Sequence, residues 1–269
     1  MTDEDSLLPE QTAAVSAMLD LPEPAASSGG PLPPLWHWFY FLQWPGQTEL
    51  GTDGHPANGH FLPPIPDRQR MFAGGRCQFV EPLRVGERAE RTSSLVNAQV
   101  KHGRTGELLF VTQRNEIRQQ GRTRVIEEQD IVYRSGRSSA SHPEVVDPTS
   151  APWPDAEWRL PVQPDPRLLF RFSALTANAH RIHYDQPYAR EEEGYPGLVV
   201  HGPLLAVLML ELVRREEPRR VSSLAFRFRS PVFALEQVVA YGTRSEAAAT
   251  LGTATHRDDR HATAEVTFA

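Results

Sequence analysis

The stretch that decides the fold is PLLAVLMLELV, at residues 203–213. As a helix it would carry apolar side chains on nearly every face, and a helix on a protein surface cannot do so. The rest of the chain must therefore surround it. Proline at its start suits the first turn of a helix, where a missing N–H costs no intrahelical bond. A sheet of about five antiparallel strands curled around one buried helix meets this demand.

Two stretches of the chain have the pattern of antiparallel meanders. Residues 77–134 contain runs rich in Val, Phe, Leu and Ile, with turn signals at residues 102–104 and 120–122. Near the C-terminus, residues 224–229 alternate apolar and polar side chains, and we expect a turn at residues 257–260. Each meander predicts a sheet.

The two meanders share three residue types at one constant offset. The pairs are Phe79 and Phe228, Pro82 and Pro231, and Glu87 and Glu236. An internal duplication accounts for this match. Two unrelated sheets that each open with a strand and a proline would also account for it, and the sequence leaves both explanations open.

The remaining segments suggest how the chain is divided. Residues 10–19 predict a short amphipathic helix, and the aromatic run WHWFYFL at residues 36–42 predicts a buried strand. Residues 46–66, rich in Gly, Pro, His and Asn, predict a long loop of the kind that often carries function. Polar, Pro-containing residues 135–156 indicate a linker. We expect a supporting half at residues 1–140, a linker at 141–156 and a catalytic half at 157–269.

Composition excludes several classes of protein. Hydrophobic residues make up 39% and charged residues 23% of the chain, and no apolar run approaches the roughly 18 residues needed to cross a bilayer. The acidic start MTDEDSLL lacks the pattern of a secretory signal, so we expect a cytoplasmic protein. Cys77 stands alone and can form no intrachain disulfide. A formal charge of −6 gives no general attraction to nucleic acid.

Cofactor motifs are also missing from the sequence. It contains no GxxxxGK[ST], GxGxxG or CxxC pattern, so it predicts no nucleotide, dinucleotide or structural zinc site. His180 and His183 have a spacing that could place two imidazoles on one helical face. No pattern fixes a third ligand beside them, and we therefore predict no metal site there.

A dense motif lies directly before the apolar helix. Residues 172–210 read FSALTANAHRIHYDQPYAREEEGYPGLVVHGPLLAVLML. This stretch resembles the hydration motif of MaoC-like enoyl-thioester hydratases and dehydratases. His183 matches the motif histidine, Asp185 follows it as the family leads one to expect, and His201 with Gly202 opens the helix. The resemblance implies an α+β double hotdog, with two antiparallel sheets that each wrap a central helix.

Two positions depart from the common form of the motif. Asn178 stands where most members have aspartate, and His180 stands where they have asparagine. This variant resembles type-2 hydroxyacyl-thioester dehydratases and the mesaconyl- and itaconyl-CoA hydratases. LPPIPDRQRMFAGGR at residues 62–76 and EEQDIVYR at residues 127–134 extend the resemblance into the first half, as a degenerate hotdog unit.

The chemistry explains the residue types. Adding water to an unsaturated thioester needs a base for the water, an acid for Cα and a donor to the thioester oxygen, but no cofactor. We expect neutral His183 to be the base and the Gly202 N–H, at a helix N-terminus, to be the donor. Pro203 has no N–H to add. The alternative for His183 is a purely structural role, in which its ring hydrogen-bonds a nearby backbone carbonyl. Asn178 cannot accept a proton, so we expect it to hold water or substrate.

The second titrating group and the acyl-binding group stay open at this point. His180, Arg181 and Asp185 are candidates for the former. An acyl carboxylate would need a fork of donors, for which Arg70, Arg76 and Arg181 are candidates, although arginines more often make surface ion pairs or bind CoA phosphates. The substrate-binding candidates are His180, Arg181, Arg70, Arg76, Asp185 and His201.

The leading hypothesis is a reversible hydratase of a short dicarboxylic enoyl-CoA, such as mesaconyl-C4-CoA or itaconyl-CoA in itaconate degradation. Dehydration of (R)-3-hydroxyacyl thioesters in fatty acid synthesis is its main rival. Acyl-CoA thioesterase activity and non-catalytic acyl-CoA binding are further alternatives. We expect acyl-CoA as the partner, no nucleic acid or membrane, and a monomeric double hotdog or a homodimer.

Overall fold

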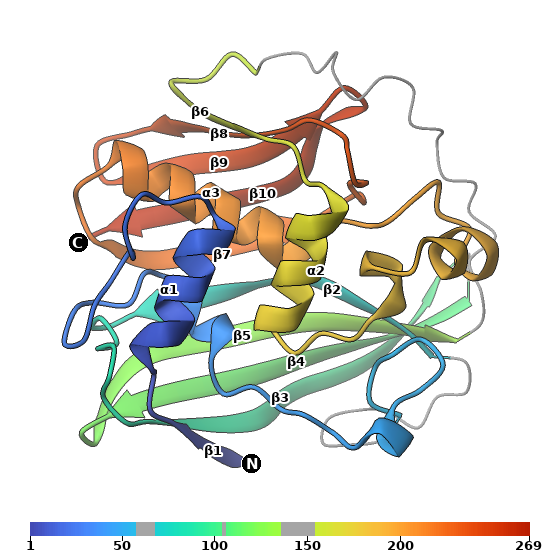
Figure 1. Cartoon of the computed structure of the whole chain (residues 1–269), viewed down its shortest axis with the longest axis horizontal. Coiled ribbons are helices and arrows are strands. Elements are labelled where there is room, and N and C mark those ends of the chain that lie inside the picture. Colours follow the sequence, from blue (N-terminus) through green and yellow to red (C-terminus); the bar gives the residue numbers. More distant parts are fainter. Residues whose placement is uncertain (58–67, 104–105, 136–153) are drawn as a thin grey trace. The chain divides into compact units, whose positions relative to one another are not determined.

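The computed structural model describes residues 1–57, 68–103, 106–135 and 154–269 (Figure 1). By its internal contacts the chain divides into two compact units. The first comprises Met1–Gly136 and Arg171–Ala179, and the second comprises Arg137–Phe170 and His180–Ala269. The expected linker at residues 141–156 lies largely outside the described residues, so the boundaries at 140 and 157 stay predictions.

The first unit contains the long meander that the sequence predicts. Its strands are β1 (Thr2–Asp5), β2 (Arg68–Phe79), β3 (Ala89–Gly103), β4 (Gly106–Gln119) and β5 (Arg122–Ser135). They lie in the order β1-β3-β4-β5-β2, and neighbours are antiparallel. The predicted turn between β4 and β5 is confirmed: Gln120 and Gly121 have φ values of 50° and 73°, as a two-residue hairpin requires. The edge strand β1 was not predicted.

The aromatic run forms a turn, and the prediction of a strand there was wrong. Trp36–Phe39 is the 3₁₀ helix η1, which contacts helix α1 (Pro9–Met18). Leu35 and Phe41, on either side, have φ values of 66° and 55°, a left-handed conformation that is incompatible with a continuous strand. A single tight turn buries successive rings at once, whereas a strand would place alternate rings on opposite faces. The apolar composition correctly indicates burial but does not determine the backbone geometry.

Helix α1 agrees with the helix predicted at residues 10–19. The loop predicted at residues 46–66 contains one short 3₁₀ helix, η2 (Gln47–Glu49), and its residues 58–66 lie outside the described chain.

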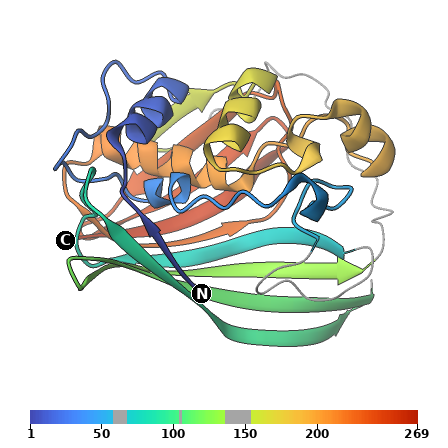
Figure 2. The same ribbon diagram turned by 60° about the horizontal axis from the view of Figure 1, so that its bottom comes forward.

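The second unit contains the buried helix. Its strands are β6 (Trp158–Val162), β7 (Val221–Phe228), β8 (Val238–Arg244), β9 (Ala248–Thr255) and β10 (Asp258–Phe268), in the order β7-β10-β9-β8-β6. Helix α3 (Gly202–Glu216) packs on β6, β8, β9 and β10 along one face of this sheet (Figure 2). Residues 204–213 are all buried. The predicted helix covered by five strands is therefore confirmed.

The turn between β9 and β10 falls earlier than predicted. Thr255 and Asp258 pair across it, so it lies at residues 256–257 and not at 257–260. Polar composition indicates a turn here without fixing its register, because strand β10 itself begins with the polar residues Asp258, Asp259 and Arg260.

The two units have the same topology. The order β6-β8-β9-β10-β7 repeats β1-β3-β4-β5-β2, strand for strand. Phe79 and Phe228 end the equivalent strands β2 and β7, and the offset between them also relates the first residues of β3 and β8. This agreement between sequence offset and strand order favours the internal duplication over two unrelated sheets.

Candidate active site

The segment that carries the motif begins at the end of a helix that was not predicted. Helix α2 (Pro166–Leu175) starts after Asp165, whose Oδ1 accepts the Leu168 N–H at 2.8 Å as an N-cap. It ends with Ala177 at φ 51°, and the Asn178 N–H donates to the Ser173 carbonyl at 2.8 Å. These are the bonds of a left-handed helix cap. Asn178 is thus fixed through its backbone one residue beyond the cap.

His183 is buried and its ring is oriented by a backbone carbonyl. It lies in the 3₁₀ helix η3 (Arg181–His183), and its Nδ1 lies 2.7 Å from the Val199 oxygen. The Val199 N–H in turn donates to the Ile182 carbonyl at 2.9 Å, which joins the two segments. A carbonyl can only accept, so Nδ1 carries the proton and Nε2 carries the lone pair in the neutral ring. The carbonyl contact that the sequence left as an alternative is present, and it sets the tautomer that a base needs.

Three imidazoles gather around this position. The rings of His183 and His201 are stacked, with centroids 3.6 Å apart and planes within 19°. His180 meets His183 edge to face at 5.4 Å. Burial, together with the charges that His183 and His180 would carry, holds the pKa of His201 well below its usual value. His201 is therefore neutral near pH 7, which avoids two stacked cations.

Gly202 is the first residue of α3, and its lack of a side chain has a packing reason. A Cβ at this position would lie 3.0 Å from the ring of Phe228. The first helical bond runs from the Leu205 N–H to the His201 carbonyl at 3.3 Å, so the Gly202 N–H precedes the hydrogen-bonded turns. The residue can thus donate from a helix N-terminus while Phe228 packs against it.

Arg181 and Asp185 bind each other. Nε and Nη2 of Arg181 donate to Oδ2 of Asp185 at 3.0 and 2.8 Å, and the guanidinium lies 4.0 Å from the centroid of the Tyr188 ring. The bond from Arg181 holds the pKa of the Asp185 carboxyl below its usual value. Asp185 Oδ1 also accepts the Tyr188 N–H at 3.2 Å. One edge of Arg181 is therefore used to build the loop, and its role in substrate binding stays a prediction.

Arg70 and Arg76 lie on β2 of the first unit. Nη1 of Arg76 contacts Asp130 at 3.1 Å, and Nη2 pairs with Glu128. In the described parts of the chain, no ion pair joins Arg70 to another residue. The structure thus brings His180, His183, His201 and Gly202 together within the second unit, while Asn178, Arg70 and Arg76 belong to the first.

Comparison with known proteins decides the family. The family model for hydroxyacyl-thioester dehydratase type 2 matches residues 35–234. A mesaconyl-C(4)-CoA hydratase from Chloroflexus aurantiacus is 52% identical over 232 residues, which cover 86% of this chain and 82% of that protein. The chain belongs to the type-2 hydroxyacyl-thioester dehydratase family. As the motif predicted, this family member is a hydro-lyase that acts on acyl thioesters.

More distant relatives agree with this assignment. The mitochondrial type-2 hydroxyacyl-thioester dehydratase of Schizosaccharomyces pombe is 27% identical over 227 residues, covering 75% of this chain and 74% of that protein. Crystal structures of a MaoC-like dehydratase from Phytophthora capsici and of HtdX from Mycobacterium tuberculosis match all of this family member, with TM-scores of 0.71 and 0.68. They cover 95% and 99% of those chains at 11% and 17% identity, and they show the predicted α+β double hotdog.

No helix within the described ranges of this family member is both long and apolar enough to cross a membrane.

Proposed function

We propose that the protein catalyses the reversible hydration of a short dicarboxylic enoyl-CoA, with mesaconyl-C4-CoA as the first substrate to test. The 52% identical relative carries that activity in its name. The observation that carries the chemistry is the buried His183 ring, whose Nδ1–H is directed at the Val199 carbonyl. This arrangement makes Nε2 the basic atom of the ring, and hydration requires such a base.

The reaction can be followed atom by atom. His183 Nε2 takes a proton from water as the oxygen adds to Cβ, and the double-bond electrons move onto the thioester oxygen. The Gly202 N–H donates to that oxygen, where the helix N-terminus favours negative charge. A second titrating group, for which His180, Arg181 and Asp185 are the candidates, then donates a proton to Cα while the enolate electrons return from the thioester oxygen. Dehydration runs the same steps backwards, with the His183 imidazolium returning its proton to the leaving hydroxyl.

Arg70 is our first candidate for the free carboxylate of the acyl group. Arg76 and Arg181 each hold carboxylates of the chain itself, whereas no described residue forms an ion pair with Arg70. A guanidinium binds a carboxylate through two parallel bonds that an ammonium cannot reproduce. Arg70→Lys should therefore raise KM for dicarboxylic substrates more than Arg76→Lys does.

Initial rates on a panel of thioesters test the proposal. We expect mesaconyl-C4-CoA or itaconyl-CoA to be hydrated with a higher kcat/KM than crotonyl-CoA or octenoyl-CoA. Activity confined to the straight-chain thioesters would refute the dicarboxylic assignment. It would instead support dehydration of (R)-3-hydroxyacyl thioesters, the activity that the fission-yeast relative's name describes.

The remaining expectations stay proposals. They are that CoA enters only as part of the substrate, that no metal or other cofactor takes part in hydration, that the protein serves itaconate degradation in the cytoplasm, and that it works as a monomeric double hotdog or a homodimer. Release of free CoA thiol during turnover would point to a thioesterase instead.

A further inference from the structure

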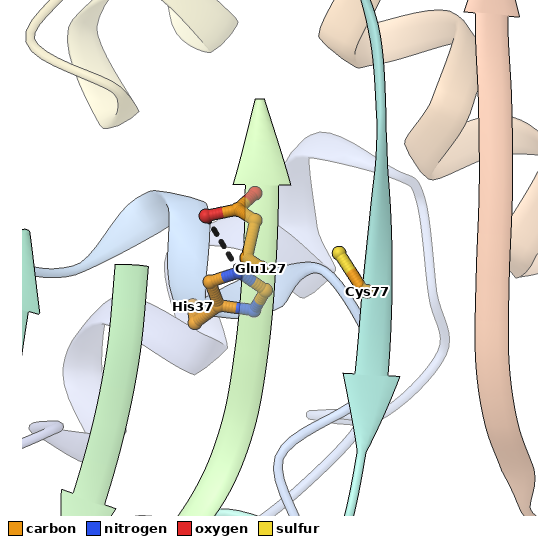
Figure 3. A group of neighbouring side chains, drawn as sticks. All are labelled: His37, Cys77 and Glu127. Carbon is orange, nitrogen blue, oxygen red and sulfur yellow. Dashed lines mark ion pairs between the residues drawn. The ribbon is translucent and has the colours of Figure 1, made fainter. Parts of the chain in front are cut away.

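Three buried side chains with metal-binding atoms meet in the first unit, in the half that the sequence predicts to be supporting. They are His37 of η1, Cys77 of β2 and Glu127 of β5, and their ligand atoms all lie within 4.8 Å of one another (Figure 3). Cys77 and Glu127 are direct partners in the antiparallel register of β2 and β5, so both side chains leave the same face of the sheet. The η1 turn brings His37 against that pair.

His37 gives the second observation. Its side chain is 4% exposed, and Nε2 is buried without a hydrogen-bond partner among the described residues. The nearest carboxylate oxygen, Oε2 of Glu127, is 3.6 Å away, which is too far for a good hydrogen bond. Leaving a buried polar atom without a hydrogen-bond partner destabilises the fold. Nε2 points at the other two ligand atoms, where a cation would satisfy it.

The distances suit a small ion. Tetrahedral zinc with bonds of about 2.0–2.3 Å places its ligand atoms about 3.3–3.6 Å apart. The separation of 3.6 Å between His37 Nε2 and Glu127 Oε2 already meets this value. All three ligand atoms lie within 4.8 Å of one another, so the Cys77 sulfur would need to shift by about 1.5 Å to reach this spacing.

Neighbouring side chains orient the carboxylate, as is usual around bound metals. Trp38 Nε1 donates to Oε1 of Glu127, and Asn115 Nδ2 donates to Oε2 at 2.9 Å. Asn115 is itself fixed by Ser93 Oγ, which donates to its Oδ1 at 2.8 Å. Each carboxylate oxygen has two lone pairs, so these bonds leave capacity to bind an ion.

The charges also balance. A divalent ion bound by a thiolate, a carboxylate and a neutral imidazole has zero net charge, as a dry interior demands. Imidazole and thiolate together favour zinc-like ions over the oxygen-seeking Mg²⁺ and Ca²⁺.

We propose that His37, Cys77 and Glu127 form a binding site for one Zn²⁺-class ion that ties the η1 turn to strands β2 and β5. Three protein ligands leave one position for water or for the second Glu127 oxygen. The three residues are far apart in sequence, which is why no metal motif is visible there.

The test uses the full-length chain without a histidine tag, produced in zinc-supplemented or cobalt-supplemented medium. We expect about one metal ion per chain by mass spectrometry. Cobalt protein should show a thiolate-to-metal charge-transfer band, and because Cys77 is the sole cysteine, that band can arise only from this site. Zinc should also raise the Tm of metal-depleted protein. None of these readouts depends on hydratase activity.

Variants separate the site from incidental binding. His37→Gln and Cys77→Ser should lose the ion and the band, and Cys77→Val, which keeps an apolar side chain in the core, should fold but show no zinc-dependent rise in Tm. His102→Gln is the matched control, because His102 faces Glu107 at 3.2 Å on the exposed surface of the same unit. It should keep full metal content.

Two results would overturn the proposal. One is folded wild-type protein that contains far less than one ion per chain and has no charge-transfer band. The other is metal content that is unchanged in Cys77→Val, which would place the ion elsewhere.

Discussion

At the scale of single residues, His183 combines a structural bond with a chemical task. His183→Asn keeps an amide N–H at the position of Nδ1, where it can donate to the Val199 carbonyl, but removes the base. We expect kcat to fall by about 10²-fold or more, because general-base catalysis typically contributes that much. Steady-state kinetics on the preferred thioester measure it, with His102→Gln as the control. A rate within a factor of about two of the parent would show that another group is the base.

Gly202 has two roles that a pair of variants can separate. Gly202→Ala places a Cβ 3.0 Å from the Phe228 ring and should destabilise the fold by about 1–3 kcal/mol, with a loss of rate. Alanine keeps its N–H, so adding Phe228→Leu should recover both stability and rate. Urea unfolding and kinetics on the single and double variants check this. If stability recovers and the rate does not, the substrate itself needs the space that glycine leaves.

The sequence identified the histidines of the site, but it could not predict which of them are in contact. The stack of His201 on His183 joins residues that no helical or strand period relates, so it depends on the fold. The binding of Arg181 by Asp185 was visible in principle, because residues four apart in a helical turn face each other. An acidic partner at this spacing favours a structural role in the loop for an arginine.

At the scale of elements, the duplicated turns before β3 and β8 offer an internal comparison. Gly86 has φ 80° in the first, and Leu235 has φ 72° at the equivalent position of the second. A left-handed conformation costs a residue with a Cβ about 1–2 kcal/mol. Leu235 is 51% exposed, so little packing is lost when it is replaced. We expect Leu235→Gly to stabilise the protein by up to about 1 kcal/mol, measured by urea unfolding.

The reciprocal variant is the control. Gly86→Ala should destabilise, because its Cβ would also lie 2.7 Å from Ser28 Oγ. A destabilising Leu235→Gly would mean that the exposed leucine packs better than its exposure suggests.

Elements were predictable where the apolar periodicity is strong. The apolar run of α3 and the alternation in β7 gave the right element, because each pattern fits one geometry only. Helix α2 was missed although Asp165 followed by Pro166 is a sound start signal. The η1 turn was not predictable from composition, since the left-handed backbone conformations at Leu35 and Phe41 fall on residues that rarely adopt them.

At the scale of the whole molecule, the duplication explains which parts of the fold could be predicted from the sequence. Both halves repeat one strand order, so predicting one sheet predicts the other. The two sheets differ in what packs against them. The sheet of the second half packs on the apolar helix α3. In the first half, Trp38 bonds to Glu127, and a turn and two strands together form a cluster of His, Cys and Glu. Such a cluster is assembled only by folding, because its members have no local spacing to detect.

Buried histidines should also make the stability of the folded chain depend on pH. Burial holds the pKa of His201 well below 6.5, and burial with the nearby Arg257 lowers that of His261. Unfolded histidines take up protons near pH 6.5 and these folded ones do not. Their contribution is therefore complete above about pH 6.5 and is lost as the pH falls toward their folded pKa values. Glu217, with a pKa of about 2, titrates below this window.

Urea unfolding at a series of pH values from about 7.5 to 5 tests this expectation. The free energy of unfolding should fall toward the acid end, with a slope of up to about 1.4 kcal/mol per pH unit for each histidine. His201→Gln should reduce the slope of the unfolding free energy against pH by the contribution of one histidine. His102→Gln, which replaces an exposed ring, should leave the slope unchanged. An equal slope in the parent and in His201→Gln would mean that His201 can be protonated without unfolding, and hence that the stacked pair opens to water more readily than its burial implies.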